Sequence, residues 1–179
     1  DVLIVTDHNV LVNDIESYTQ EGKRRLLLLA GEEVHDRTSP VGGNHMLIFG
    51  HNLELSRFAS NRQQLIDQAR SAGASTVLAH PFDDPLPLFN EKSFNWTDWD
   101  VKGFTGIELW NQMSEFKTRS QTLPKAALHA LFPGFMMLSP LEQTLKLWDE
   151  LLLTRKHPIV AVAGVDAHAQ SYRAGPFKV

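Results

Sequence analysis

The sequence predicts an α/β fold in a single domain that spans residues 1–179. The chain is 42% hydrophobic and 21% charged, which is enough apolar material for one compact core. Short apolar runs alternate with amphipathic helical patterns, which indicates parallel βα units rather than a β-sandwich. Polar residues stand beside the apolar runs. In a βα barrel such residues meet at one rim of the barrel.

The predicted strands are short, apolar and partly β-branched, as expected for strands buried on both faces. They lie at residues 2–6, 26–30, 46–49, 76–79, 106–107 and 159–164. Most of these runs lead into a carboxylate or an imidazole, and His45 opens the third run.

Two helices are predicted from apolar residues that recur on one face, at 59–72 and 141–154. Pro140 is a suitable start signal for the second helix. Residues 82–102 have no clean period and contain Trp96 and Trp99. We expect an ordered loop whose aromatic side chains form a lid or a substrate wall, or alternatively fill the flank of the domain.

The overall charge argues against several classes of partner. Seventeen basic and twenty-one acidic residues give a formal net charge of −4, and the basic residues are scattered, so no footprint for a nucleic-acid duplex is expected. No apolar run is long enough to cross a membrane. Without cysteine, any metal must bind nitrogen and oxygen ligands. We assume a cytoplasmic location by default.

Imidazoles and carboxylates recur at the ends of the predicted strands. They are Asp7, His8, Glu33, His45, His80, Asp166 and His168. Gathering so many of these groups in one cavity would be costly without a positive charge among them. Such ligands suit two or three Mn, Zn or Fe ions, and Glu33, Asp166 or both could bridge two ions.

Five motifs along the chain resemble those of the PHP (polymerase and histidinol phosphatase) domain family. They are Thr6-Asp7-His8-Asn9, Gly31-Glu32-Glu33-Val34, His45-Met46-Leu47, Ala79-His80-Pro81 and Gly164-Val165-Asp166-Ala167-His168. The resemblance implies a distorted (β/α)7 TIM-like barrel with up to three metal ions at its rim. It also implies a phosphoesterase activity that uses a metal-bound hydroxide as the nucleophile.

The resemblance also implies a role for each matched residue. Glu33, His45 and His80 would hold one ion, and Glu33 would bridge to a neighbouring ion bound by Asp166. His8 and His168 would help to hold a third ion. Asp7 and His168 are the expected catalytic residues, with Asp7 orienting an adjacent ligand.

Other polar residues near these motifs are weighed separately. Strand alternation points Glu32 and Glu33 to opposite sides, and the resemblance favours Glu33 as the ligand. His35 would share the side of Glu33 if the strand continued, but a loop role is expected. Glu108 is expected either to contact substrate or a metal ligand, or to form a salt bridge.

One departure from the family pattern affects the expected activity. The family opens with a His-x-His motif on its first strand, and no two histidines of this chain are two positions apart. We expect that the first strand and its histidine pair precede Asp1 in a longer chain, or alternatively that the site is degenerate.

The expected function is hydrolysis of a phosphomonoester or phosphodiester, with a small anionic phosphoester or short nucleotide as substrate. The alternatives are hydrolysis of a carbamate, ester or amide, and a non-catalytic domain that supports a larger protein.

Overall fold

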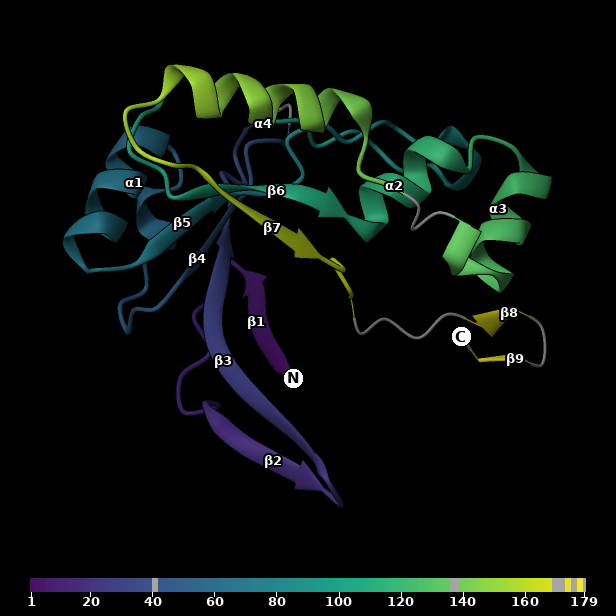
Figure 1. Ribbon diagram of the computed structural model, residues 1–179, viewed down its shortest axis with the longest axis horizontal. Coiled ribbons are helices and arrows are strands. Elements are labelled where there is room, and N and C mark those ends of the chain that lie inside the picture. Colours follow the sequence, from purple (N-terminus) through teal and green to yellow (C-terminus); the bar gives the residue numbers. More distant parts are fainter. Residues whose placement is uncertain (40–41, 136–138, 169–172, 175–176, 179) are drawn as a thin grey trace.

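The computed structural model describes residues 1–39, 42–135, 139–168, 173–174 and 177–178, and these form a mixed α/β fold around one main sheet (Figure 1). The sheet has the order β1-β3-β4-β5-β6-β7, with β2 paired to the outer part of β3. Its strands are β1 (Val2–His8), β2 (Ser17–Glu21), β3 (Arg24–Val34), β4 (Met46–Phe49), β5 (Ser75–Leu78), β6 (Gly106–Asn111) and β7 (Val160–Gly164).

Among the described residues, four α-helices accompany the sheet: α1 (Arg62–Ser71), α2 (Gln112–Arg119), α3 (Leu123–Leu131) and α4 (Glu142–Thr154). The same residues form 3-10 turns at Ser56–Phe58, Pro87–Phe89 and Pro133–Phe135, and a short hairpin of β8 (Arg173–Ala174) and β9 (Phe177–Lys178). The two predicted helices are confirmed as α1 and α4, with slightly later starts. Helices α2 and α3 and strand β2 were not predicted.

The prediction of a parallel sheet is right for most strands and wrong for β4. Strand β1 is parallel to β3, and β5, β6 and β7 are mutually parallel. Strand β4 runs antiparallel to both of its neighbours. A parallel crossover needs a dozen or more residues, usually with a helix, and the described part of the β3–β4 connection contains none.

The α/β class is therefore confirmed, and the described strands form an open, curled sheet with β1 and β7 at its edges. In Figure 1 the long strand β3 bends away from the rest, and its outer half pairs with β2 as a two-stranded arm. All of β2 and the start of β3 are exposed, whereas residues 30–34 of β3 are buried.

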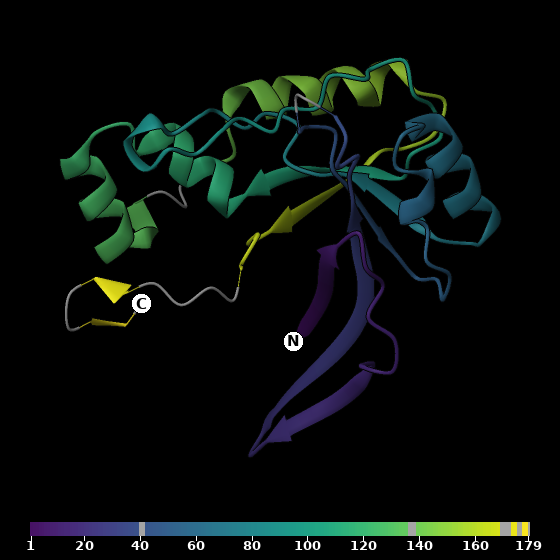
Figure 2. The ribbon, with the colours of Figure 1, turned by 180° about the vertical axis from the view of Figure 1, so that it is seen from behind.

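The core lies between the inner part of the sheet and the two helices that cover it. Helix α1 packs on β5 and α4 packs on β6, and both views show α4 running along the sheet (Figures 1 and 2). Leu65, Ile66 and Ala69 form the buried face of α1. Trp96 also joins the core, so this tryptophan fills the flank rather than forming a lid.

No described helix is both long and apolar enough to cross a membrane.

Candidate metal centre

The imidazoles and carboxylates at the strand ends meet at one edge of the sheet because of the way its strands pair. His8 ends β1 and lies directly opposite Glu33 near the end of the parallel strand β3. Residues that follow β5 and β7 reach the same edge. His45 comes just before β4, and the reversed direction of β4 brings this start beside the ends of its neighbours.

Glu33 is the centre of the buried part of the site. Its Oε1 lies 2.6 Å from His45 Nδ1 and 3.4 Å from His80 Nε2. All three side chains are buried, and their ligand atoms lie within 4.8 Å of one another, so they could hold a metal ion. Because the ligand set contains two imidazoles and one carboxylate, it suits a transition-metal ion.

In this buried part of the site, Glu33 and His80 each favour the charged form of the other. Burial by itself would raise the pKa of Glu33, but its hydrogen bonds with His45 and His80 hold that pKa well below its usual range. Burial lowers the pKa of His80, but the hydrogen bond with Glu33 and the charges of Glu33 and Glu108 outweigh this effect and raise it to about 9. Glu33 is therefore ionised, and its negative charge favours a cation beside it.

A second, more exposed part of the site lies beside Glu33. His8 Nδ1 is 3.9 Å from Glu33 Oε1, and His8 Nε2 is 3.2 Å from His168 Nε2. His168 Nδ1 in turn lies 3.6 Å from Asp166 Oδ1. The structure thus brings six predicted ligands into one cluster. They are His8, Glu33, His45, His80, Asp166 and His168.

Glu108 and Asn111 of β6 make polar contacts with two residues of the cluster, His80 and Asp166. Glu108 Oε2 accepts hydrogen bonds from the backbone N–H of His80 at 2.8 Å and from Asn111 Nδ2 at 2.9 Å. Asn111 Nδ2 also lies 3.3 Å from Asp166 Oδ2, and its Oδ1 accepts from Ser114 N, which caps α2. Of the two expectations for Glu108, the structure shows the contact with a predicted ligand, His80. Asn111 was missed.

Burial has a clear effect on Glu108. It raises the pKa of this carboxyl to about 7, although the charge of His80 and the hydrogen bond from Asn111 act in the opposite direction. A Cβ at Gly164 would lie 2.0 Å from Glu108 Oε1. Because Gly164 at the end of β7 has no side chain, the Glu108 carboxyl can occupy this space.

Several residues at the cluster have a left-handed backbone, which is uncommon for residues other than glycine. His80 has a φ of 28° and Asp166 a φ of 51°, and Asn9 and Asn44, which adjoin His8 and His45, have φ values of 56° and 62°. Such conformations often occur at functional sites, where the surrounding structure maintains them.

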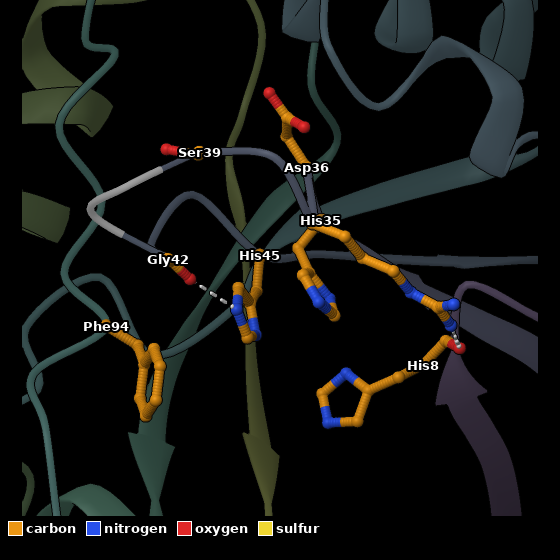
Figure 3. A pocket seen from close by; sticks show the side chains of 8 residues that line it. His8, His35, Asp36, Ser39, Gly42, His45 and Phe94 are labelled. Carbon is orange, nitrogen blue, oxygen red and sulfur yellow. Dashed lines mark hydrogen bonds between the residues drawn. The ribbon is translucent and has the colours of Figure 1, made fainter.

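A cavity of about 450 Å³ opens onto His8 and His45. Figure 3 shows the rings of His8, His35 and His45 facing the same space, with Phe94 beside His45 and Asp36 pointing away from the rings. Phe94 is thus the aromatic residue of the loop 82–102 that lines this cavity, and neither Trp96 nor Trp99 lines it. Its N–H donates to Asp83, and Asp83 forms a buried ion pair with Lys117 of α2.

The structure does not bring Asp7 into this cluster. Asp7 is exposed, and because successive residues of a strand alternate, its side chain lies on the face of β1 opposite to His8. Asp7 pairs in register with Glu32, which also lies away from the cluster and accepts a hydrogen bond from Leu55 N. Glu33, rather than Glu32, faces the imidazoles.

His35 is the cluster residue for which a loop role was expected. Its ring centroid lies 5.0 Å from that of His8 and 4.4 Å from that of His45. The spacing of two residues from Glu33 was the available signal, because the ring of His35 lies on the side of Glu33 although β3 ends at Val34. Burial lowers the pKa of His35 to about 4, reinforced by His45 and His8.

Comparison with known proteins adds no relative to this description. No protein-family model matches the chain, and neither a curated protein nor a solved structure matches it significantly.

Proposed function

We propose that this chain is a metal-dependent phosphoesterase of the PHP type. The observation that carries the proposal is the buried triad of Glu33, His45 and His80, with further imidazole and carboxylate ligands beside it. Those further ligands are His8, Asp166 and His168. The distorted barrel of that family belongs to the same proposal.

The residues present fit divalent ions. Within the cluster, the buried ring nitrogens His8 Nδ1 and His80 Nδ1 have no hydrogen-bond partner among the described residues. A buried polar atom without a partner is unusual and needs an explanation. Mn, Zn or Fe would suit this mixture of imidazole and carboxylate ligands. Such ions activate water at neutral pH and neutralise charge on phosphoester oxygens.

The protein's own groups have separate tasks in this proposal. Glu33 supplies the negative charge at the centre, and Glu108 fixes the backbone of His80. Arg37 lines the mouth of the cavity and donates a hydrogen bond to the His8 carbonyl. Its guanidinium favours an anionic substrate. Phe94 offers an apolar face to the organic part of that substrate.

The test combines metal content with turnover of p-nitrophenyl phosphate and bis(p-nitrophenyl) phosphate. We expect Glu33→Ala to lose metal from the buried triad and at least 100-fold in kcat/KM, because Glu33 is the only carboxylate among the three ligands of that triad. Glu150→Ala, which removes an exposed carboxylate of α4, is the matched control. Retention of metal and turnover in a folded Glu33→Ala protein would contradict the proposal.

The same experiment separates the alternatives. Turnover of an aryl carbamate or aryl ester in place of the phosphoesters, with the same dependence on Glu33, would indicate hydrolysis at a carbon centre. Metal binding without turnover of any of these compounds would indicate a domain that binds metal and supports a larger protein.

A further inference from the structure

Three imidazoles line the mouth of the cavity, in front of the buried triad. They belong to His8, at the end of β1, to His35, just after β3, and to His45, just before β4. One nitrogen from each ring can be chosen so that all three lie within 4.8 Å of one another. His8 and His35 are half-buried and His45 is buried, so the group is open on the side of the cavity.

Strand pairing explains why these rings meet. His8 lies opposite Glu33 in the β1–β3 register, and His35 follows Glu33 by two residues, so His8 and His35 extend from adjacent strands on the same side. The ring of His35 is nearly parallel to that of His45, with an interplanar angle of 20°, and nearly perpendicular to that of His8, at 86°. Figure 3 shows His35 between the other two.

Asn9 positions His35. Its backbone N–H donates to the Glu33 carbonyl at 2.9 Å, and its Oδ1 accepts from the His35 N–H at 3.0 Å. The Asn9 amide nitrogen also lies 3.4 Å from His35 Nδ1. These contacts, together with the left-handed backbone of Asn9, turn the chain after β1 toward the end of β3. A specific turn thus holds His35 beside His8.

We propose that His8, His35 and His45 form a second cation position, at the mouth of the cavity, for a borderline transition-metal ion such as Zn²⁺ or Co²⁺. It adds to the proposed metal centre and rests on that proposal through His8 and His45, which it shares with the ligands proposed there. Three neutral imidazoles select such ions over Mg²⁺ and Ca²⁺, which prefer oxygen ligands.

Binding requires an adjustment of the rings. The two ring nitrogens of His45 lie 2.6 Å from Glu33 Oε1 and 2.8 Å from Gly42 O, so an ion at the mouth replaces one of these contacts. Zn–N bonds of about 2.0–2.1 Å place two ligand nitrogens about 3.3 Å apart, so the rings must rotate inward from their present separation. The cavity leaves space for that rotation. The neutral ring of His45 offers a single lone pair, so it can serve one of the two positions at a time.

Occupancy of the mouth position therefore competes with occupancy of the Glu33–His45–His80 position. Removal of the buried position should leave the mouth position intact. Co²⁺ is a suitable probe, because its visible absorption reports the number and geometry of its ligands.

The experiment is titration of the metal-free chain with Co²⁺ in the background of His80→Ala, which removes the buried position. We expect His80→Ala to bind one Co²⁺ and the double variant His80→Ala/His35→Ala to bind it at least tenfold more weakly. His80→Ala/His157→Ala removes an exposed histidine outside the cavity and should bind Co²⁺ like His80→Ala. Far-UV circular dichroism checks folding, and His35→Gln replaces His35→Ala if the alanine variant does not fold.

Two outcomes would overturn the proposal: no Co²⁺ binding by folded His80→Ala, or equal binding with and without His35. Equal binding would place the ion on other ligands, such as His8, His168 and Asp166. Because these readouts are binding constants and spectra, they are independent of phosphoester turnover. The Co²⁺ titration can therefore contradict the mouth position while phosphoester turnover supports the proposed hydrolase. It can equally support the mouth position when no turnover is found.

Discussion

Glu32 and Glu33 are adjacent in sequence and have opposite electrostatic environments. The hydrogen bonds of Glu33 with His45 and His80 keep it ionised, as described above. Burial raises the pKa of Glu32 to about 8, with a further contribution from a hydrogen bond with Glu54. Glu54 accepts the backbone N–H of Leu11 and of Ser56. One strand thus presents a carboxylate to the metal centre and a carboxylic acid to the other side.

The Glu32 carboxyl predicts how stability depends on pH. Its pKa is about 8 in the folded chain, against an ordinary value of 4.5. The folded state therefore holds a proton that the unfolded state releases. The stabilisation is fully present below about pH 4.5 and is lost as pH rises toward 8.

Glu32→Gln should weaken that dependence, because glutamine resembles the protonated carboxyl and does not ionise. Both proteins are compared without metal. Between pH 5 and pH 8, the free energy of unfolding should fall by at least about 1 kcal/mol more in the wild type than in Glu32→Gln, since one pKa unit corresponds to about 1.4 kcal/mol. Urea unfolding at both pH values measures the change. Glu150→Gln, at an exposed position, is the control. The same loss of stability in Glu32→Gln and the wild type would show that Glu32 ionises normally in the folded chain.

At the scale of single elements, the junction between β6 and α2 combines folding and function in one side chain. Asn111 caps α2 through its Oδ1, and its Nδ2 lies between Glu108 and Asp166. The residue that caps the helix, Asn111, therefore also links two carboxylates of the site.

Two substitutions separate these tasks. Asn111→Ser keeps a good capping group and removes the amide donor, whereas Asn111→Ala removes both. We expect Asn111→Ala to lose about 0.5–2 kcal/mol of stability and Asn111→Ser to lose less. Both should weaken Zn²⁺ binding by about 10–100-fold, as is usual when a group that orients a metal ligand is removed.

Calorimetric titration with Zn²⁺ and urea unfolding provide the two readouts. Unchanged Zn²⁺ affinity in Asn111→Ser would show that the amide serves only the helix.

The strand direction shows what the sequence could and could not reveal. Polar residues at strand ends are local signals, and they correctly located six clustered residues. The antiparallel direction of β4 was missed, although His45 precedes its strand while His8 ends β1 and His80 follows β5. Side-chain alternation is identical for a strand read in either direction, so only the position of the polar residue distinguished the two.

Longer-range contacts were beyond the reach of the sequence. The face of β1 that carries Asp7 could not be assigned until the register with β3 was known. Helix α2 contributes a buried lysine, Lys117, whose partner Asp83 is 34 positions away in the chain. No local pattern predicts such a pair. Asp83 also accepts a hydrogen bond from the backbone N–H of Phe94, and this contact positions Phe94 at the cavity.

At the scale of the whole molecule, the cluster joins the two edges of the sheet. His8 belongs to the edge strand β1, and His168 follows the opposite edge strand β7, yet their Nε2 atoms lie 3.2 Å apart. The curl of the sheet is what brings these edges together. An ion bound here would connect segments 160 positions apart in the sequence.

Metal binding should therefore stabilise the entire fold and not only the site. An ion that binds the folded chain at about 100 times its Kd contributes about 2.7 kcal/mol. For a chain of this length, each kcal/mol corresponds to about 2–4 °C in Tm. We expect Zn²⁺ to raise the Tm of the metal-free chain by roughly 5–10 °C, and Mg²⁺, which prefers oxygen ligands, to have little effect. Glu33→Ala should lose most of the Zn²⁺ shift, whereas His157→Ala should keep it, and calorimetric scans of the three proteins measure this. An equal shift in Glu33→Ala would mean that the ion binds elsewhere, and the sheet edges would then be held together without it.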